Sequence, residues 1–179
     1  MMVCVYMPHA GYEDVAVEEV YAGMSELRAD AKEKKRRLLA AGDFNAVVGR
    51  RRDEFGEDPK VVGVHGIGER NARGNMMVQW ATAEGLCLIT TQYRKQFAQL
   101  WTHKNGGSLR QIDHFVLEQD CRQWARNAES SDSICLGGDH RAVKLEVLLA
   151  PRQRRMRPQT KNGGALEGAG SLTIKTNTK

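Results

Sequence analysis

Acidic side chains follow three hydrophobic runs of this sequence, each at a point where a β-strand would end. Asp43 and Asn45 follow the run LLAAG, Asp113 stands in RQIDHFVL, and Asp139 and His140 follow a Gly-Gly pair in LGGDHRAV. Side chains of these types can hydrolyse a phosphodiester. Hard oxygen ligands hold Mg²⁺, a carboxylate positions the attacking water, and a histidine held by a second carboxylate binds the phosphate.

The segment GDFN has two interpretations when it is considered alone. In an extended strand Asp43 and Asn45 are two residues apart, lie on the same face, and could share a ligand. Asp and Asn are also favoured in turns after strands, because their side chains bond the local backbone. The segment by itself favours the turn, and its combination with the other two motifs favours chemistry.

Hydrophobic periodicity predicts the elements that would position these side chains. Strands are expected at residues 1–8, 38–43, 86–90, 100–102, 110–117, 133–136 and 142–149, and amphipathic helices at residues 12–35 and 71–84. Residues 50–70 are expected to form a polar loop, whose glycines match neither common phosphate-binding pattern and are interpreted as loop residues. The pattern is that of a mixed α/β domain.

Charge and composition divide the 179 residues into a body and a tail. The formal net charge is +5, but residues 151–179 hold seven Lys or Arg against the single acid Glu167, so residues 1–150 are nearly neutral. We expect one folded domain over residues 1–150 and a basic disordered tail over residues 151–179. The tail could bind nucleic acid, act as a nuclear address, or only increase solubility.

The cysteines and the hydropathy indicate an intracellular protein without a membrane span. Cys4, Cys87, Cys121 and Cys135 form no C-x-x-C pair, and three of them lie in apolar runs, so reduced core thiols are expected. The sequence contains no run of about 20 apolar residues, and the N-terminus lacks the features of a signal peptide.

Taken together and in order, the motifs resemble the endonuclease/exonuclease/phosphatase superfamily from Val3 to about Leu149. The opening VYMPHAG is similar to the Y-x-P segment of the apurinic/apyrimidinic endonuclease branch. The stretches GIGERNARGNMMVQWATAEGLCLITTQY and LWTHKNGGSLRQIDHFVL are similar to the endonuclease domain of LINE-type non-LTR retrotransposons and to proteins like craniofacial development protein 2.

The resemblance implies a fold and a role for each candidate residue. The fold would be a four-layer α/β sandwich of the DNase I-like type, with mixed β-sheets flanked by helices. Asp43 would orient or deprotonate the attacking water, Asn45 would bind the scissile phosphate, and Tyr6 would contact it from the opposite wall. Asp139 would bind the metal, and His140, oriented by Asp113, would bind the phosphate. The implied metal is Mg²⁺ or Mn²⁺, and the implied partner is DNA.

The sequence also departs from the family pattern. Gly138 stands where the family has Ser, Thr90 where relatives have Asn, and His9 where nucleases of the branch often carry Asn. In the family an earlier half of the domain contributes strands to both sheets, together with an Asn and a Glu that help to hold the metal. We therefore expect this chain to be the C-terminal portion, with an N-terminal half and a reverse-transcriptase region as candidate missing parts. The remaining residues of interest are interpreted as structural or surface histidines (His9, His65, His103 and His114) and as a core residue beside the site (Trp101).

Three functions are compatible with these observations. The first is the C-terminal part of a Mg²⁺-dependent DNA endonuclease, which we expect to cleave poorly without its earlier half. The second is a catalytically inactive retroelement remnant that binds nucleic acid. The third is a phosphatase of the same superfamily that acts on an inositol phosphate or a phospholipid headgroup, although the stretch from Gly66 to Thr91 argues against it.

Overall fold

The computed structural model describes residues 1–133 and 138–148. Its helices and strands, in chain order, are β1 (Met2–Tyr6), α1 (Asp14–Glu33), β2 (Leu39–Asp43), α2 (Ala72–Ala83), β3 (Leu86–Leu88), β4 (His103–Asn105), β5 (Ser108–Arg110), β6 (Asp113–Glu118), β7 (Ala125–Ser131) and β8 (Ala142–Val147). Short 3₁₀ helices lie at Asp53–Phe55, Ile89–Thr91, Phe97–Gln99 and Gln119–Trp124. The predicted tail at residues 151–179 lies outside the described residues.

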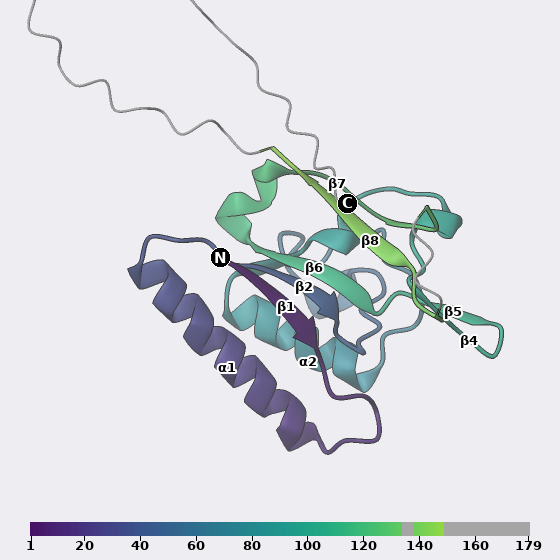
Figure 1. Cartoon of the computed structure of the whole chain (residues 1–179), viewed down its shortest axis with the longest axis horizontal. Helices are drawn as coiled ribbons and strands as arrows, with labels where there is room; N and C mark the ends of the chain where they lie inside the picture. The colour runs from purple at the N-terminus through teal and green to yellow at the C-terminus, as the bar shows by residue number, and fades with distance from the viewer. Residues whose placement is uncertain (134–137, 149–179) are drawn as a thin grey trace, which may run out of the picture. The chain divides into compact units, whose positions relative to one another are not determined.

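A mixed four-stranded sheet forms the centre of the fold, in the order β1-β2-β6-β3. Figure 1 labels its strands β1, β2 and β6. Strand β1 runs parallel to β2, whereas β6 runs antiparallel to both β2 and β3. The register pairs Tyr6 with Asp43 and Asp43 with Asp113. Register partners on neighbouring strands point to the same face of a sheet. The register therefore gathers three of the predicted site residues at one end of the sheet.

Both described α-helices pack on one face of this sheet and form the larger hydrophobic core. Residues Val17, Tyr21 and Met24 of α1 and Met77, Val78, Trp80 and Ala81 of α2 meet Val5, Ala40, Leu88 and Val116 of the strands. The Tyr21 ring stacks on Trp80 with their centroids 4.9 Å apart, and the Trp80 indole donates to the Ser25 hydroxyl at 3.0 Å. These contacts fix the two helices to each other and to the sheet.

The opposite face of the sheet is covered by a second, two-stranded sheet made of β7 and β8. A smaller core of Cys87, Leu117, Ala125 and Ala128, flanked by Leu39, Phe115 and Leu145, lies between the two sheets. The described residues therefore form helices, sheet and sheet as successive layers, in agreement with the predicted mixed sheets flanked by helices. None of the helices in the described part of the chain is long and apolar enough to cross a membrane.

Both predicted helices are confirmed, as are the strands that end at Tyr6 and Asp43. The strand predicted at 100–102 is wrong, because β4 begins only at His103. The strand predicted at 110–117 is interrupted between β5 and β6. There the Ile112 N–H donates to the Thr102 hydroxyl at 3.1 Å and its carbonyl accepts from Phe44 N at 2.9 Å, so neither group joins the ladder of β5.

Two further differences concern the ends of the second sheet and the cysteines. Strand β7 was not predicted, because its buried positions are small or polar residues, Ala125, Ala128, Ser130 and Ser131. The strand predicted at 133–136 falls, apart from Ser133, outside the described residues. Cys87 and Cys121 are free and buried as predicted, but Cys4, on the edge strand β1, is exposed.

Candidate active site

Asp43 is held at the end of β2 by its neighbours on both sides. Gly42 has a φ of 144°, and a Cβ at this position would lie 1.9 Å from the Val5 carbonyl oxygen, so the position requires glycine. Asp43 Oδ1 accepts from the Asn45 backbone N–H at 2.8 Å. This is the local turn that Asp favours. The other oxygen, Oδ2, lies 3.8 Å from His140 Nε2. One oxygen of the carboxylate thus stabilises the turn, and the other faces the candidate site.

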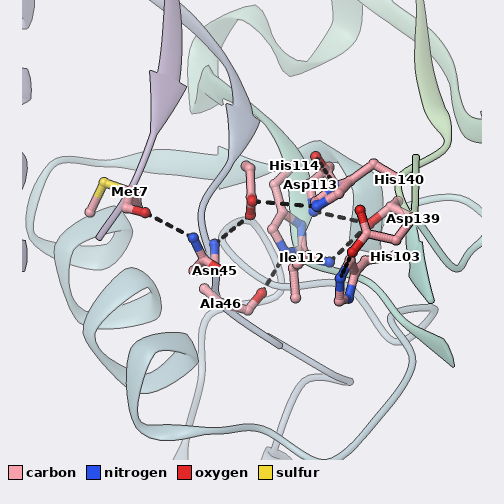
Figure 2. A network of polar contacts seen from close by, with 11 residues as sticks. Met7, Asn45, Ala46, His103, Ile112, Asp113, His114, Asp139 and His140 are labelled. Atoms are coloured by element: carbon pink, nitrogen blue, oxygen red, sulfur yellow. Dashed lines mark hydrogen bonds and ion pairs between the residues drawn. The ribbon is translucent and has the colours of Figure 1, made fainter. Parts of the chain in front are cut away.

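Asn45 reaches the site by a route that differs from the predicted one. It lies beyond the end of β2 and has a left-handed φ of 48°, so strand alternation does not place it beside Asp43. Its carboxamide nitrogen instead donates to the Met7 carbonyl at 2.8 Å (Figure 2). This bond ties the turn after β2 to the residue after β1 and fixes the orientation of the amide.

His140 and Asp113 form the predicted pair. His140 Nδ1 lies 3.1 Å from Asp113 Oδ2 and 3.3 Å from Oδ1 (Figure 2). A carboxylate only accepts, so this contact assigns the proton of the neutral ring to Nδ1. The Nε2 atom then carries the lone pair and lies on the side of Asp43.

Thr102 positions Asp113. Its buried hydroxyl accepts from the backbone N–H of both Ile112 and Asp113 at 3.1 Å. Its backbone also joins the segment that carries His140: the Thr102 carbonyl accepts from Arg141 N at 2.7 Å. The sequence assigned no role to Thr102, which lies in the family-like stretch LWTHKNGGSLRQIDHFVL, and the geometry gives it a positioning role.

Asp139 and His103 form a second pair next to His140. His103 Nε2 lies 3.1 Å from Asp139 Oδ2, and the rings of His103 and His140 have their centroids 4.6 Å apart (Figure 2). The Asp139 side chain is 63% exposed, whereas that of His103 is only 13% exposed. His103, interpreted from the sequence as a structural or surface residue, is placed opposite His140 by β4. The sequence around His103, two residues after Trp101, contains no motif that indicates its position beside Asp139 and His140.

The remaining sequence-selected residues lie in different surroundings. His114 is fully buried and both of its ring nitrogens have partners, Thr90 Oγ1 at 2.7 Å and the Ala46 carbonyl at 2.9 Å, so it is structural as predicted. Thr90, which departs from the family pattern, thus has a structural contact. Trp101 was expected in the core but is half-buried, and the Arg141 guanidinium lies over its ring, 4.3 Å from the ring centroid. Tyr6 is 79% exposed at the end of β1.

The two site carboxylates outside the His140–Asp113 pair titrate differently. Burial raises the pKa of Asp43 above its ordinary value, and the nearby charge of Asp113 adds to this effect. The Asn45 N–H opposes the rise. The pKa of Asp139 is lowered by a hydrogen bond from its own backbone N–H and by the contact with His103. Asp43 is thus the better proton acceptor, and Asp139 the more permanent anion.

A metal ion could be held at one end of this constellation. Ligand atoms of His103, Asp139 and His140 all lie within 4.8 Å of one another. Mg²⁺ is commonly held by one or two carboxylates, with water and substrate oxygens as its other ligands. The exposed Asp139 carboxylate fits this role. Among the residues that the structure describes, however, this cluster contains no second carboxylate, so Mg²⁺ would be held weakly.

Comparisons with known proteins agree with the resemblance drawn from the sequence. No protein-family model matches the chain. The chain is 25% identical over 181 residues to craniofacial development protein 2 of Bos taurus, covering 98% of this chain and 30% of that protein. It is 26% identical over 124 residues to the protein of the same name from Tragulus javanicus, covering 66% of this chain and 21% of that protein. The chain thus spans less than a third of these relatives.

Solved structures show the same architecture. The 3′ phosphatase NExo from Neisseria, bound to a product DNA hairpin, matches with a TM-score of 0.55 and 17% identity, over 83% of this chain and 61% of that chain. The 3′-5′ exonuclease NExo from Neisseria meningitidis matches with a TM-score of 0.57 and 16% identity, over 82% of this chain and 60% of that chain. The described chain therefore shares the fold of these proteins.

Proposed function

We propose that this chain, whose fold is that of the DNase I-like endonuclease/exonuclease/phosphatase superfamily, carries the hydrolytic site of a metal-dependent DNA endonuclease. One observation carries the proposal. His140 lies between two carboxylates, with Nδ1 3.1 Å from Asp113 and Nε2 3.8 Å from Asp43. An imidazole held in this way has one nitrogen fixed by Asp113 and the other directed towards the space beside the half-buried Asp43.

The roles follow from the groups that each side chain presents. Asp43, whose pKa is raised by burial, takes the proton of the attacking water. The Asn45 amide, oriented by the Met7 carbonyl, donates to a phosphate oxygen. Once its Nε2 is protonated, His140 donates to another phosphate oxygen, and Tyr6 at the neighbouring strand end offers its hydroxyl.

A bound Mg²⁺ or Mn²⁺ would neutralise the charge that develops on the phosphate. Asp139 supplies the carboxylate that would hold the ion. Since no second carboxylate joins it within the described residues, we expect hydrolysis by this chain alone to be slow. A misplacement of the reacting groups by about 1 Å can cost on the order of 100-fold in rate.

The DNA would extend from this site over basic and aromatic surface. The segment after Asn45 leads into a hollow of about 460 Å³ whose lining includes Arg50, Arg52 and Phe97, together with Arg51, which is paired with Asp53 at 2.6 Å. Cations that neutralise phosphates and an exposed aromatic ring suit a nucleic-acid partner. This supports DNA over an inositol phosphate as the substrate.

A nicking assay with supercoiled plasmid tests the proposal. The full chain is used in excess over the plasmid, with Mg²⁺ or with EDTA, beside the Asp43→Ala and His140→Ala variants and an Asp30→Ala control on α1. We expect slow nicking that is lost with EDTA and in both site variants, but not in the control. Nicking that survives in either site variant would overturn the assignment.

The alternative is a catalytically inactive remnant that still binds nucleic acid, and the single carboxylate of the metal cluster favours it. The same samples separate the two. Binding of a labelled duplex by the unaltered chain, without any nicking above the EDTA control, would support the remnant and exclude the enzyme.

A further inference from the structure

We propose that His103, Asp139 and His140 form a binding site for a divalent transition metal of the zinc class, distinct in its ligands from an oxygen-coordinated Mg²⁺ site. The three side chains offer ligand atoms within 4.8 Å of one another, and the group consists of two imidazoles and one carboxylate (Figure 2). We also infer that this metal would inhibit hydrolysis, and that part rests on the proposed function. The binding of the metal does not depend on the proposed function.

The ligand types select the metal. Imidazole nitrogen suits Zn²⁺, Co²⁺, Ni²⁺ and Cu²⁺, whereas Mg²⁺ prefers oxygen and gives up its water reluctantly. Two histidines with one carboxylate, and a further position left for water, form a common zinc ligand set. In tetrahedral zinc with bonds of about 2.0–2.1 Å the ligand atoms lie roughly 3.3 Å apart. His103 Nε2 and Asp139 Oδ2 are already 3.1 Å apart, which is close to this spacing. Coordination of one ion by all three side chains therefore requires mainly that this pair and His140 approach each other.

His140 has the outer partner that a metal-bound histidine usually has. Its Nδ1 lies 3.1 Å from Asp113, and this leaves Nε2 as the ligand atom. Such a carboxylate–histidine pair fixes the tautomer and makes the imidazole a stronger ligand. Asp113 is in turn held by the Thr102 hydroxyl, so the support extends into the core.

His103 does not have the contacts of a purely structural histidine. Both ring nitrogens of the buried His114 have partners, whereas His103 Nδ1 is buried and has no hydrogen-bond partner within the described residues. Its described polar contact is with Asp139 through Nε2. The ring is thus kept beside the carboxylate with its other nitrogen unsatisfied, an arrangement that a structural role alone does not explain.

The backbone sets the spacing of the ligands. Lys104 N donates to the Asp139 carbonyl at 2.8 Å, and Arg141 N donates to the Thr102 carbonyl at 2.7 Å. These two bonds place His103 directly opposite His140 in an antiparallel bridge. The bridge holds the backbone of two of the three ligands in a fixed register.

This site and the hydrolytic site share two residues. A zinc-class ion would occupy the carboxylate of Asp139 and the Nε2 atom of His140, which the proposed hydrolysis uses for Mg²⁺ and for the phosphate. Binding of the two kinds of metal is therefore mutually exclusive, and zinc would act as an inhibitor.

Titration with Co²⁺, followed by the visible absorption of the bound ion, tests the binding directly. The full chain is titrated alone and with a large excess of Mg²⁺, and its folding is checked by circular dichroism. We expect one equivalent of Co²⁺ to bind, Zn²⁺ to displace it, and Mg²⁺ excess to leave it in place. His103→Phe and Asp139→Asn should each weaken binding by at least about 10-fold, the scale of effects on ligand support.

Two control variants exclude binding elsewhere. His9→Gln removes a histidine outside the cluster, and Asp120→Asn removes a ligand of the other His/Cys/acid group, Glu118–Asp120–Cys121. Neither should change Co²⁺ affinity. Unchanged affinity in folded His103→Phe and Asp139→Asn, or displacement of Co²⁺ by Mg²⁺, would overturn the proposal. A failure of plasmid nicking would leave this titration unaffected, so the two proposals fail separately.

Discussion

His140 Nδ1 lies 3.1 Å from Asp113 Oδ2, although 27 positions separate the two residues in the sequence. The contact forms because β6 begins at Asp113 beside the segment that leads into β8. Thr102 contacts both segments. Its hydroxyl accepts a hydrogen bond from the Asp113 N–H, and its carbonyl accepts one from the Arg141 N–H. One threonine therefore holds both partners of the pair.

Replacement of Asp113 by Asn should slow DNA cleavage by about 100-fold, because the amide no longer fixes the proton on His140 Nδ1 and the ring loses its orientation. The measurement is the single-turnover nicking rate with the full chain in excess over plasmid. Asp30→Asn, which neutralises an exposed acid paired with Lys34 on α1, should have no effect. An unchanged rate in Asp113→Asn would show that His140 acts without its carboxylate.

Asp43→Asn should raise the stability of the fold at neutral pH while it abolishes cleavage. Burial raises the pKa of Asp43 above 3.8, so the folded protein holds this proton more tightly than the unfolded chain does. The free energy of unfolding therefore falls as the pH rises through the interval between 3.8 and the folded-state pKa. Asn removes the charge and keeps an oxygen for the Asn45 N–H.

Thermal denaturation of both proteins across this pH interval checks the prediction. The melting temperature of Asp43→Asn should exceed that of the unaltered chain at neutral pH, and the difference should shrink below pH 3.8. A lower melting temperature for the variant at neutral pH would contradict it, and would indicate that the carboxylate is stabilised by its surroundings.

Thr102→Val should destabilise the protein by about 2–3 kcal/mol. The valine side chain has nearly the same shape but leaves the N–H groups of Ile112 and Asp113 without an acceptor, and each unpaired buried donor costs about 1–3 kcal/mol. Thr102→Ser keeps the hydroxyl and serves as the matched control. Urea denaturation of the three proteins measures the effect, and a loss in Thr102→Val no larger than that in Thr102→Ser would contradict the role of the hydroxyl.

Gly42→Ala should destabilise the fold by at least about 3 kcal/mol, within the range caused by severe steric conflict. The new Cβ would lie 1.9 Å from the Val5 carbonyl oxygen, which belongs to the neighbouring strand backbone. Gly23→Ala on α1 is the control, since apart from the adjoining helix backbone no atom lies within 4 Å of its Cβ position. That change should stabilise the protein by about 0.5–1 kcal/mol. Comparable stability of the two variants in denaturant unfolding would disprove the close approach.

The sequence by itself determined the local elements and the chemical groups of the candidate site. Helical periodicity located α1 and α2, and apolar runs located β1 and β2, because these signals depend only on residues near one another in the chain. The three acid-bearing motifs were recognisable for the same reason. The contact between Asp113 and His140 was also expected, but only from the resemblance to a known family.

The tertiary structure decided what depends on distant partners. Strand β7 buries small residues against β6 and gives little hydrophobic signal, and the 100–102 segment is not a strand because Thr102 bonds across to Ile112 and Asp113. Asn45 is placed by the Met7 carbonyl rather than by strand alternation. His103 joins Asp139 and His140 only because an antiparallel bridge brings β4 opposite the segment before β8. Such pairings are set by the register between strands, which the spacing of residues along the chain does not contain.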